Sequence, residues 1–192
     1  MADRRRRPQW LLPHHGPPVA AFGRRGERLH FLARRGHDHS PRGGYDAIIV
    51  THANRDRPVI PAPGETTERA TVRGLVEAWR KLPDVPIVAI RDNPSMPASL
   101  PGCVAEHRER AAQVCAVSRS RGLANFDGQG EGARQVPRAH LVDMTSFYCT
   151  ATLCSPVVGN VLVYRDLAHI TATYAATLSP YIERKVVAAI TR

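Results

Sequence analysis

Apolar and polar residues alternate along the chain in blocks that predict strands followed by helices. YDAIIVT (45–51) and PIVAI (86–90) each have the unbroken apolar centre of a strand that is buried on both faces. Between them, apolar residues recur at helical spacing over 65–81, with acidic residues in the first turn and basic residues in the last, as the helix dipole favours. The first half of the chain therefore predicts a strand, a helix and a second strand.

The second half continues the same alternation. We expect, in order, a polar-faced helix over 104–120, a glycine-rich loop over 121–139, a strand HLVDM (140–144), a short apolar stretch VLVY (161–164) and a final helix over 170–190. Pro180 is expected to kink the last helix or split it in two. RLHFLA, which begins at Arg28, is a candidate for one more short strand. Strands that alternate with helices indicate βαβ units and a mostly parallel sheet with helices on both faces.

The first 27 residues differ in composition from the rest. They are rich in Arg, Pro, His and Gly and show no strand or helix period, which predicts a disordered segment over 1–27 and a folded domain over 28–192. The start is basic, as in a signal peptide, but histidines and prolines interrupt the apolar run that export requires, so no export signal is expected. No apolar run approaches the roughly 20 residues that a membrane helix needs.

The net charge of +10 is concentrated near the N-terminus. Residues 1–43 carry ten arginines against Asp3, Glu27 and Asp38, which accounts for +7 of the +10. The rest of the chain is close to neutral and has no basic helix or interleaved aromatic surface of the kind that nucleic-acid-binding proteins use. A nucleic acid is therefore not an expected partner. An arginine-rich nucleic-acid binder remains as a third hypothesis, in which deletion of 1–27 abolishes binding.

The four cysteines form two local pairs, Cys103 with Cys115 and Cys149 with Cys154. Pairs this close favour disulfides that close short loops, and disulfides indicate an oxidising, extracytoplasmic location. Zinc binding and free thiols are the alternatives, although neither spacing matches the common zinc knuckle. The histidines other than His169 converge on no ligand set, so neither a metal nor a cofactor is expected.

Asp166 and His169 lie at the junction between the last apolar stretch and the last helix. In an open α/β sheet, ligands bind at the carboxyl ends of the strands, so a site is expected at this junction. A D-x-x-H turn lets the carboxylate accept the Nδ1 proton of the imidazole, which leaves Nε2 able to take a proton from a serine hydroxyl. The structural alternative is that Asp166 is the N-cap of the final helix.

The segment from Cys149 to Thr171, C-x4-C-SPVVGNVLVYRD-x2-H-IT, resembles in order and spacing the SGNH domain that is fused to membrane acyltransferases of acyltransferase family 3. IVAIRDNP (87–94), the first cysteine pair and HLVDMT (140–145) resemble the same family, so the likeness covers residues 45–190. It implies a flavodoxin-like SGNH-hydrolase fold, a three-layer α/β sandwich with a parallel sheet. It also implies transfer or hydrolysis of O-acyl groups on cell-envelope glycans, a membrane acyltransferase domain as partner, and a location on the extracytoplasmic side of the cell membrane.

Carried over residue by residue, Asp166 and His169 match the acid and the base of the family's Ser-His-Asp triad. Asn54, in HANR (52–55), lies where SGNH enzymes have an asparagine that stabilises the oxyanion, but it lacks the flanking Gly and Asp. The alternative for Asn54 is a turn residue. The nucleophile motif G-D-S is missing before residue 45, and Ser40 follows the wrong strand. The other candidate serines lie too late in the chain: Ser95, Ser146 and Ser155.

The missing motif leads to three further expectations. The first, central strand of the family's sheet should be missing, which would expose an apolar edge on the 45–51 strand. The chain should be the tail of a longer acyltransferase, with residues 1–27 arising from an altered reading frame or a misplaced start. As an SGNH acyltransferase or esterase domain it should be inactive, because an acyl-enzyme needs a nucleophile. The alternative function is a non-catalytic glycan-binding module of the cell envelope.

Overall fold

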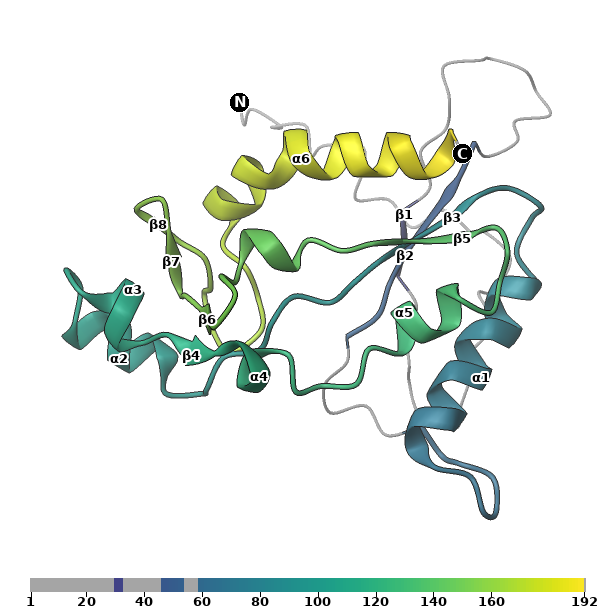
Figure 1. The fold of residues 1–192 in the computed structure, drawn as a ribbon, viewed down its shortest axis with the longest axis horizontal. Coiled ribbons are helices and arrows are strands. Elements are labelled where there is room, and N and C mark those ends of the chain that lie inside the picture. Colours follow the sequence, from purple (N-terminus) through teal and green to yellow (C-terminus); the bar gives the residue numbers. More distant parts are fainter. Residues whose placement is uncertain (1–29, 33–45, 54–58, 192) are drawn as a thin grey trace, which may run out of the picture.

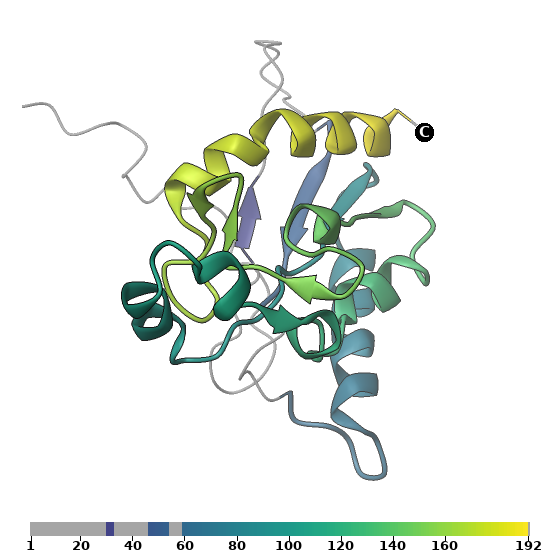
Figure 2. The ribbon, with the colours of Figure 1, turned by 60° about the vertical axis from the view of Figure 1, so that its left-hand side comes forward.

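The structure, a computed structural model, describes residues 30–32, 46–53 and 59–191. At its centre is a four-stranded sheet in the order β1-β2-β3-β5, composed of β1 (His30–Leu32), β2 (Ile48–Thr51), β3 (Ile87–Ile90) and β5 (Ala139–Val142). β2, β3 and β5 are parallel, whereas β1 runs antiparallel to β2 (Figure 1, Figure 2). The predicted α/β class with a parallel sheet is confirmed.

The edge of the sheet beside β2 differs from the expected one. The predicted strands over 45–51, 86–90 and 140–144 are confirmed, and the RLHFLA candidate is β1. The expectation of an exposed edge on the 45–51 strand is wrong, because β1 pairs directly with β2 over its three residues. As expected, no parallel first strand lies between β1 and β2 in the described residues. An antiparallel strand therefore takes the place beside β2.

Helices cover both faces of this sheet. In the described part of the chain, α1 (Thr67–Arg80) and α5 (Gly128–Ala133) lie on one face, and α6 (Ala172–Ile190) lies on the other (Figure 1). α1 follows the predicted apolar pattern, with buried side chains at Ala70, Val72, Leu75, Val76 and Trp79. The resulting three layers are those of a flavodoxin-like domain.

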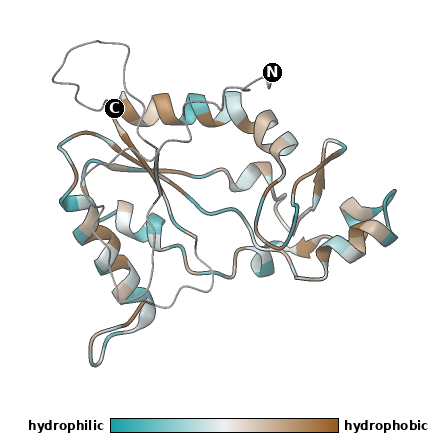
Figure 3. Cartoon of the chain, turned by 180° about the vertical axis from the view of Figure 1, so that it is seen from behind, coloured by the Kyte–Doolittle hydropathy of each residue, from teal (hydrophilic) through white to brown (hydrophobic). Residues whose placement is uncertain are grey.

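The parallel strands supply apolar side chains to both faces. On one face Val50, Ile87 and Ala89 pack with α1, around the fully buried Trp79. On the other face Val88 packs in the core that includes the buried side of α6. Figure 3 shows the hydrophobic colour along the central strands. Because successive side chains of a strand point to opposite faces, an unbroken apolar run serves both cores.

Polar contacts fix both ends of α1. At its start the Thr66 hydroxyl accepts a hydrogen bond from the Arg69 amide, as an N-cap residue does. At its end the guanidinium of Arg138 donates to the carbonyls of Trp79, Leu82, Pro83 and Val85. Arg138 directly precedes β5, so this cluster ties the end of the helix to the start of the strand.

The predicted helix over 104–120 is wrong. The chain instead forms α2 (Leu100–Glu106), α3 (Ala111–Val114), the short strand β4 (Val117–Ser118) and α4 (Arg119–Gly122). The Cys103–Cys115 disulfide explains the break, because its Cα atoms are 5.9 Å apart at a sequence separation of 12. A straight helix would hold Cα atoms with that separation about 18 Å apart, so helix and disulfide are incompatible. The predicted loop over 121–139 also contains a helix, α5.

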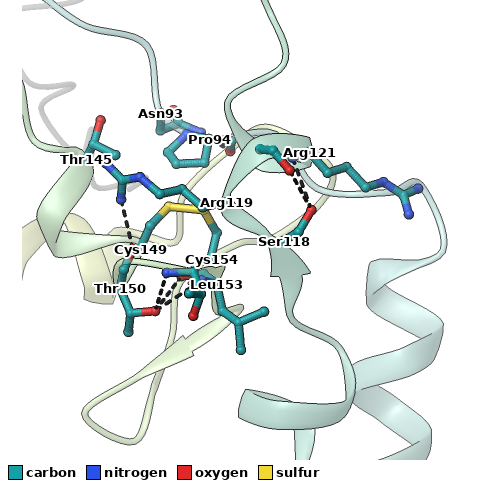
Figure 4. The surroundings of a disulfide bond; sticks show 12 residues. Asn93, Pro94, Ser118, Arg119, Arg121, Thr145, Cys149, Thr150, Leu153 and Cys154 are labelled. Atoms are coloured by element: carbon teal, nitrogen blue, oxygen red, sulfur yellow. Dashed lines mark hydrogen bonds between the residues drawn. A yellow bond between two sulfur atoms is a disulfide. The ribbon is translucent and has the colours of Figure 1, made fainter.

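The second disulfide, Cys149–Cys154, closes a tight loop beside α4. Cys154 is fully buried and ends β6 (Leu153–Cys154), which pairs antiparallel with β4. Figure 4 shows the guanidinium of Arg119 donating to the Thr150 carbonyl within this loop. Both predicted disulfides are confirmed, and each of the four cysteines is bonded.

The C-terminal part consists of a short 3-10 helix, a hairpin and the long helix α6. The 3-10 helix spans Thr145–Phe147, and β7 (Val157–Val158) and β8 (Val161–Leu162) form the hairpin. α6 continues through Pro180 as one helix, so it is not split in two. None of the helices in the described ranges combines the length and the apolar character that crossing a membrane requires.

Candidate active site

The Asp166–His169 turn connects β8 to α6. Tyr164 and Ile170 form an antiparallel bridge on either side of the turn, and the Arg165 amide donates to the His169 carbonyl at 2.8 Å. Tyr164 is 2% exposed, so the turn rises directly from the buried core. These contacts make residues 165–169 a closed turn on a rigid base.

Asp166 holds the imidazole and the backbone of this turn at the same time. Nδ1 of His169 lies 2.8 Å from Oδ2 and 3.0 Å from Oδ1 of Asp166. Oδ1 also accepts hydrogen bonds from the amides of His169, at 2.8 Å, and Ala168, at 2.9 Å. The two amide hydrogen bonds, followed by the imidazole contact, hold the pKa of Asp166 well below its usual value. The carboxylate is therefore ionised at neutral pH and accepts the Nδ1 proton.

Asp166 is not the N-cap of the last helix. That position belongs to Thr171, whose Oγ1 accepts a hydrogen bond from the Tyr174 amide at 3.1 Å. The N-cap alternative for Asp166 is therefore wrong. Its carboxylate instead closes the turn by accepting hydrogen bonds from the amides two and three residues further along the chain.

No serine in the described residues reaches the imidazole. The His169 side chain is 69% exposed, and within residues 46–53 and 59–191 its ring hydrogen-bonds to Asp166 and to no serine hydroxyl. Ser95 instead accepts from the Asn125 amide, and Ser155 donates to main-chain carbonyls. Ser146 lies in the 3-10 helix Thr145–Phe147. Ser40 and Asn54, the other two predicted site residues, lie outside the described residues.

A pocket of about 380 Å³ lies beside the turn, at the carboxyl ends of β2 and β3. Its apolar wall includes Tyr148, Ile170 and Leu178, and its polar lining includes Asn93. Asn93 also contacts the turn itself, because its amide donates to the Ala168 carbonyl at 2.9 Å. Sequence reasoning does not single out Asn93, since RDNP has the form of a simple turn. The available signal is an amide side chain three residues beyond a buried strand.

The charged groups at this edge of the sheet pair with one another. Arg91, which follows β3, lies 3.2 Å from a carboxylate oxygen of Asp127 and 2.8 Å from one of Asp143. Burial opposes the ionisation of Asp143, but hydrogen bonds from Thr145 and Arg91 outweigh it and lower the pKa of the carboxyl group. Within the residues that the structure describes, no three metal-ligating side chains gather in one place.

The arrangement of layers and strands recurs in a solved structure, the periplasmic domain of a lipopolysaccharide acetyltransferase from Salmonella ser. Paratyphi A. The TM-score is 0.55 at 16% sequence identity, with 74% of this chain and 57% of that chain covered, so the likeness concerns the fold and the chain spans little more than half of that domain. The family described as "SGNH domain (fused to AT3 domains)" matches residues 27–184. The chain therefore belongs to this family, which confirms the resemblance seen in the sequence. Comparison with curated proteins gives no match.

Proposed function

We propose that this domain handles O-acyl groups on cell-envelope glycans, with Asp166 as the acid and His169 as the base of its site. The observation that carries the proposal is the pairing of Nδ1 of His169 with an ionised Asp166 at 2.8 Å on an exposed turn. A carboxylate on Nδ1 fixes the tautomer in which Nε2 carries the free lone pair. That atom can then take a proton from an attacking hydroxyl group and return it to the leaving group.

The family and the cysteines support an extracytoplasmic setting for this chemistry. The family is described by its fusion to AT3 domains, which supports a membrane acyltransferase domain as the partner of the proposed site. The solved relative is a periplasmic domain of an acetyltransferase that acts on lipopolysaccharide. Two disulfides suit the oxidising conditions outside the cytoplasm. Together these observations favour an envelope glycan as acceptor or ester substrate.

The chain should not turn over esters by itself, because none of the serines in the described residues reaches Nε2 of His169. Hydrolysis of p-nitrophenyl acetate would test this, with the native chain compared to Asp166→Asn and His169→Ala. We expect the same background rate from all three. A native rate that falls in both variants would contradict inactivity and show that a nucleophile works with the pair.

A glycan-binding module without catalysis is the second candidate, because the pocket of about 380 Å³ lies beside an acid–base pair that no serine of the described residues reaches. NMR titration with an O-acetylated oligosaccharide, and with the same oligosaccharide after de-O-acetylation, separates the two readings. Acyl handling requires amide shifts at His169 and its turn that depend on the acetyl group. Equal shifts for both sugars support simple glycan binding, and no shifts near the turn refute both functions.

A further inference from the structure

The two peptide groups that lead into His169 are each held on both sides. On one side their N–H groups, those of Ala168 and His169, donate to Oδ1 of Asp166. On the other side their carbonyls, those of Leu167 and Ala168, accept hydrogen bonds from residues 93–96. The Met96 amide donates to the Leu167 carbonyl, and the Asn93 side chain donates to the Ala168 carbonyl, each at 2.9 Å. A planar trans peptide held at both its N–H and its C=O has a fixed orientation.

The segment that supplies these donors, residues 93–96, directly continues the chain from β3 of the central sheet. The Arg91 amide donates to the Val142 carbonyl at 3.0 Å, which extends the β3–β5 ladder, and the Ser95 amide donates to the Gly122 carbonyl at 2.8 Å. The Asn93 amide is held by Oδ1 of Asp92 at 3.0 Å. Met96 is 5% exposed, so the segment is also packed in the core. The turn therefore rests on a part of the molecule with little freedom to move.

Both amide hydrogens of the Asn93 side chain are already used within the protein. Besides the Ala168 carbonyl, its Nδ2 donates to the Pro94 carbonyl at 3.3 Å. An oxyanion donor needs a free N–H directed at the substrate, so this geometry argues against that role for Asn93.

We propose that Asn93 is a positioning residue, which holds the Ala168–His169 peptide so that the imidazole stays against Asp166. The catalytic meaning of this role rests on the proposed function, whereas the positioning itself concerns only the turn. Asn93 acts through the Ala168 carbonyl and through no contact with substrate. It couples the end of the central strand β3 to the orientation of His169, at a distance of 75 residues along the chain.

Asn93→Ala and Asn93→Asp both remove the donor, and the aspartate keeps the size of the side chain should the alanine variant fail to fold. Asn125→Ala is the matched control, because its exposed amide donates to nearby Ser95 and not to the turn. We expect amide hydrogen exchange at Ala168 and His169 to rise by about three- to tenfold in both Asn93 variants, the loss of one hydrogen bond. The side-chain ¹⁵N spectrum of His169 should lose its single Nδ1–H tautomer.

Exchange in α1, far from the turn, should stay unchanged in the Asn93 variants, and the Asn125 variant should match the native chain at Ala168 and His169. The proposal is overturned if a folded Asn93 variant keeps native exchange at Ala168 and His169 and a native His169 spectrum. It is also overturned if exchange rises equally in α1, which would show general destabilisation. None of these measurements uses an ester or a glycan. They therefore test the positioning role of Asn93 even if the proposed function is wrong.

Discussion

Gly122, at the end of α4, lies against the fully buried Cys154 of the second disulfide. A Cβ atom on Gly122 would lie 2.9 Å from Sγ and 3.3 Å from Cβ of Cys154, and 3.4 Å from Cβ of Pro94. Because Sγ is bonded to Cys149, the cysteine cannot rotate away. Overpacking of this kind costs about 1–3 kcal/mol, from which alanine's better helix propensity recovers up to about 1 kcal/mol. We expect Gly122→Ala to lower the free energy of unfolding by about 1–2 kcal/mol.

Urea unfolding followed by circular dichroism, without reductant, measures this change. Gly74→Ala is the matched control, since Gly74 lies inside α1 and a Cβ atom there meets nothing within 4 Å. That variant should be more stable than the native chain by up to about 1 kcal/mol, because only the propensity difference acts. The two glycine substitutions should therefore move the unfolding midpoint in opposite directions.

The disulfide itself supplies the sharper test. In a background with Cys149→Ala and Cys154→Ala the sulfur atom is gone, so Gly122→Ala should lose most of its cost, a coupling of about 1 kcal/mol or more. The background alone should be less stable by roughly 2 kcal/mol on the chain-entropy model, for a loop closed at a separation of 5. Strict additivity of the three substitutions, or a neutral Gly122→Ala, would refute the packing argument.

Three further perturbations test other contacts. Arg138→Ala should lower the free energy of unfolding by about 2–3 kcal/mol, because four main-chain carbonyls between residues 79 and 85 lose a charged donor; Arg138→Lys should recover only part of it in the same urea assay. Arg73 lowers the pKa of Glu65 from 4.5 to about 2, so this pair stabilises the fold above pH 4.5 and is lost as the pH falls towards 2. Glu65→Gln should reduce the change of the unfolding midpoint with pH between pH 4.5 and 2. A variant whose midpoint varies with pH as much as that of the native chain would argue against the pair. Thr171→Ala should cost about 1 kcal/mol through loss of the α6 N-cap, whereas Thr171→Ser should stay near native stability.

The parallel strands could be predicted because their signal is local. An unbroken apolar run such as IVAI (87–90) can be satisfied only where both faces are covered, so the sequence implies the central position of β3 in the described sheet. The pairing of β1 with β2 could not be predicted in the same way. It depends on which edge is left free once the other strands have paired, and no residue of the RLHFLA run carries that information.

The predicted helix over 104–120 failed because a long-range bond overrides local propensity. The polar and apolar spacing there is helical, yet the Cys103–Cys115 disulfide forces the chain to turn back after α2. A straight helix and this disulfide cannot both form. A sequence that predicts the Cys103–Cys115 disulfide therefore argues against an uninterrupted helix over 104–120.

The helix α5 failed to appear in the prediction for the opposite reason. Its glycines disfavour a helix, but the absence of side chains permits close packing, since a Cβ on Gly132 would lie 3.2 Å from the Trp79 ring.

The contact between Asp166 and His169 could be predicted from the spacing D-x-x-H, because it lies within one turn, whereas the proposed acid and base roles rest on the resemblance of the whole segment to the family. Asn93 could not, since its partner Ala168 is remote in sequence and contributes only a backbone carbonyl, which leaves no trace in residue identity. The same limit applies to Met96, whose contribution is an amide that any residue except proline has.

The Asp166 carboxylate has two separable uses, and this bears on how the site would persist over generations. One is the chemical use that we propose, which requires His169. The other is structural, because the carboxylate closes the turn through the amides of Ala168 and His169. Selection for a well-folded domain alone would retain Asp166 and would tolerate substitutions of His169. Relatives that keep the aspartate but replace the histidine would therefore have lost the proposed chemistry. A retained aspartate alone indicates only that the domain still folds.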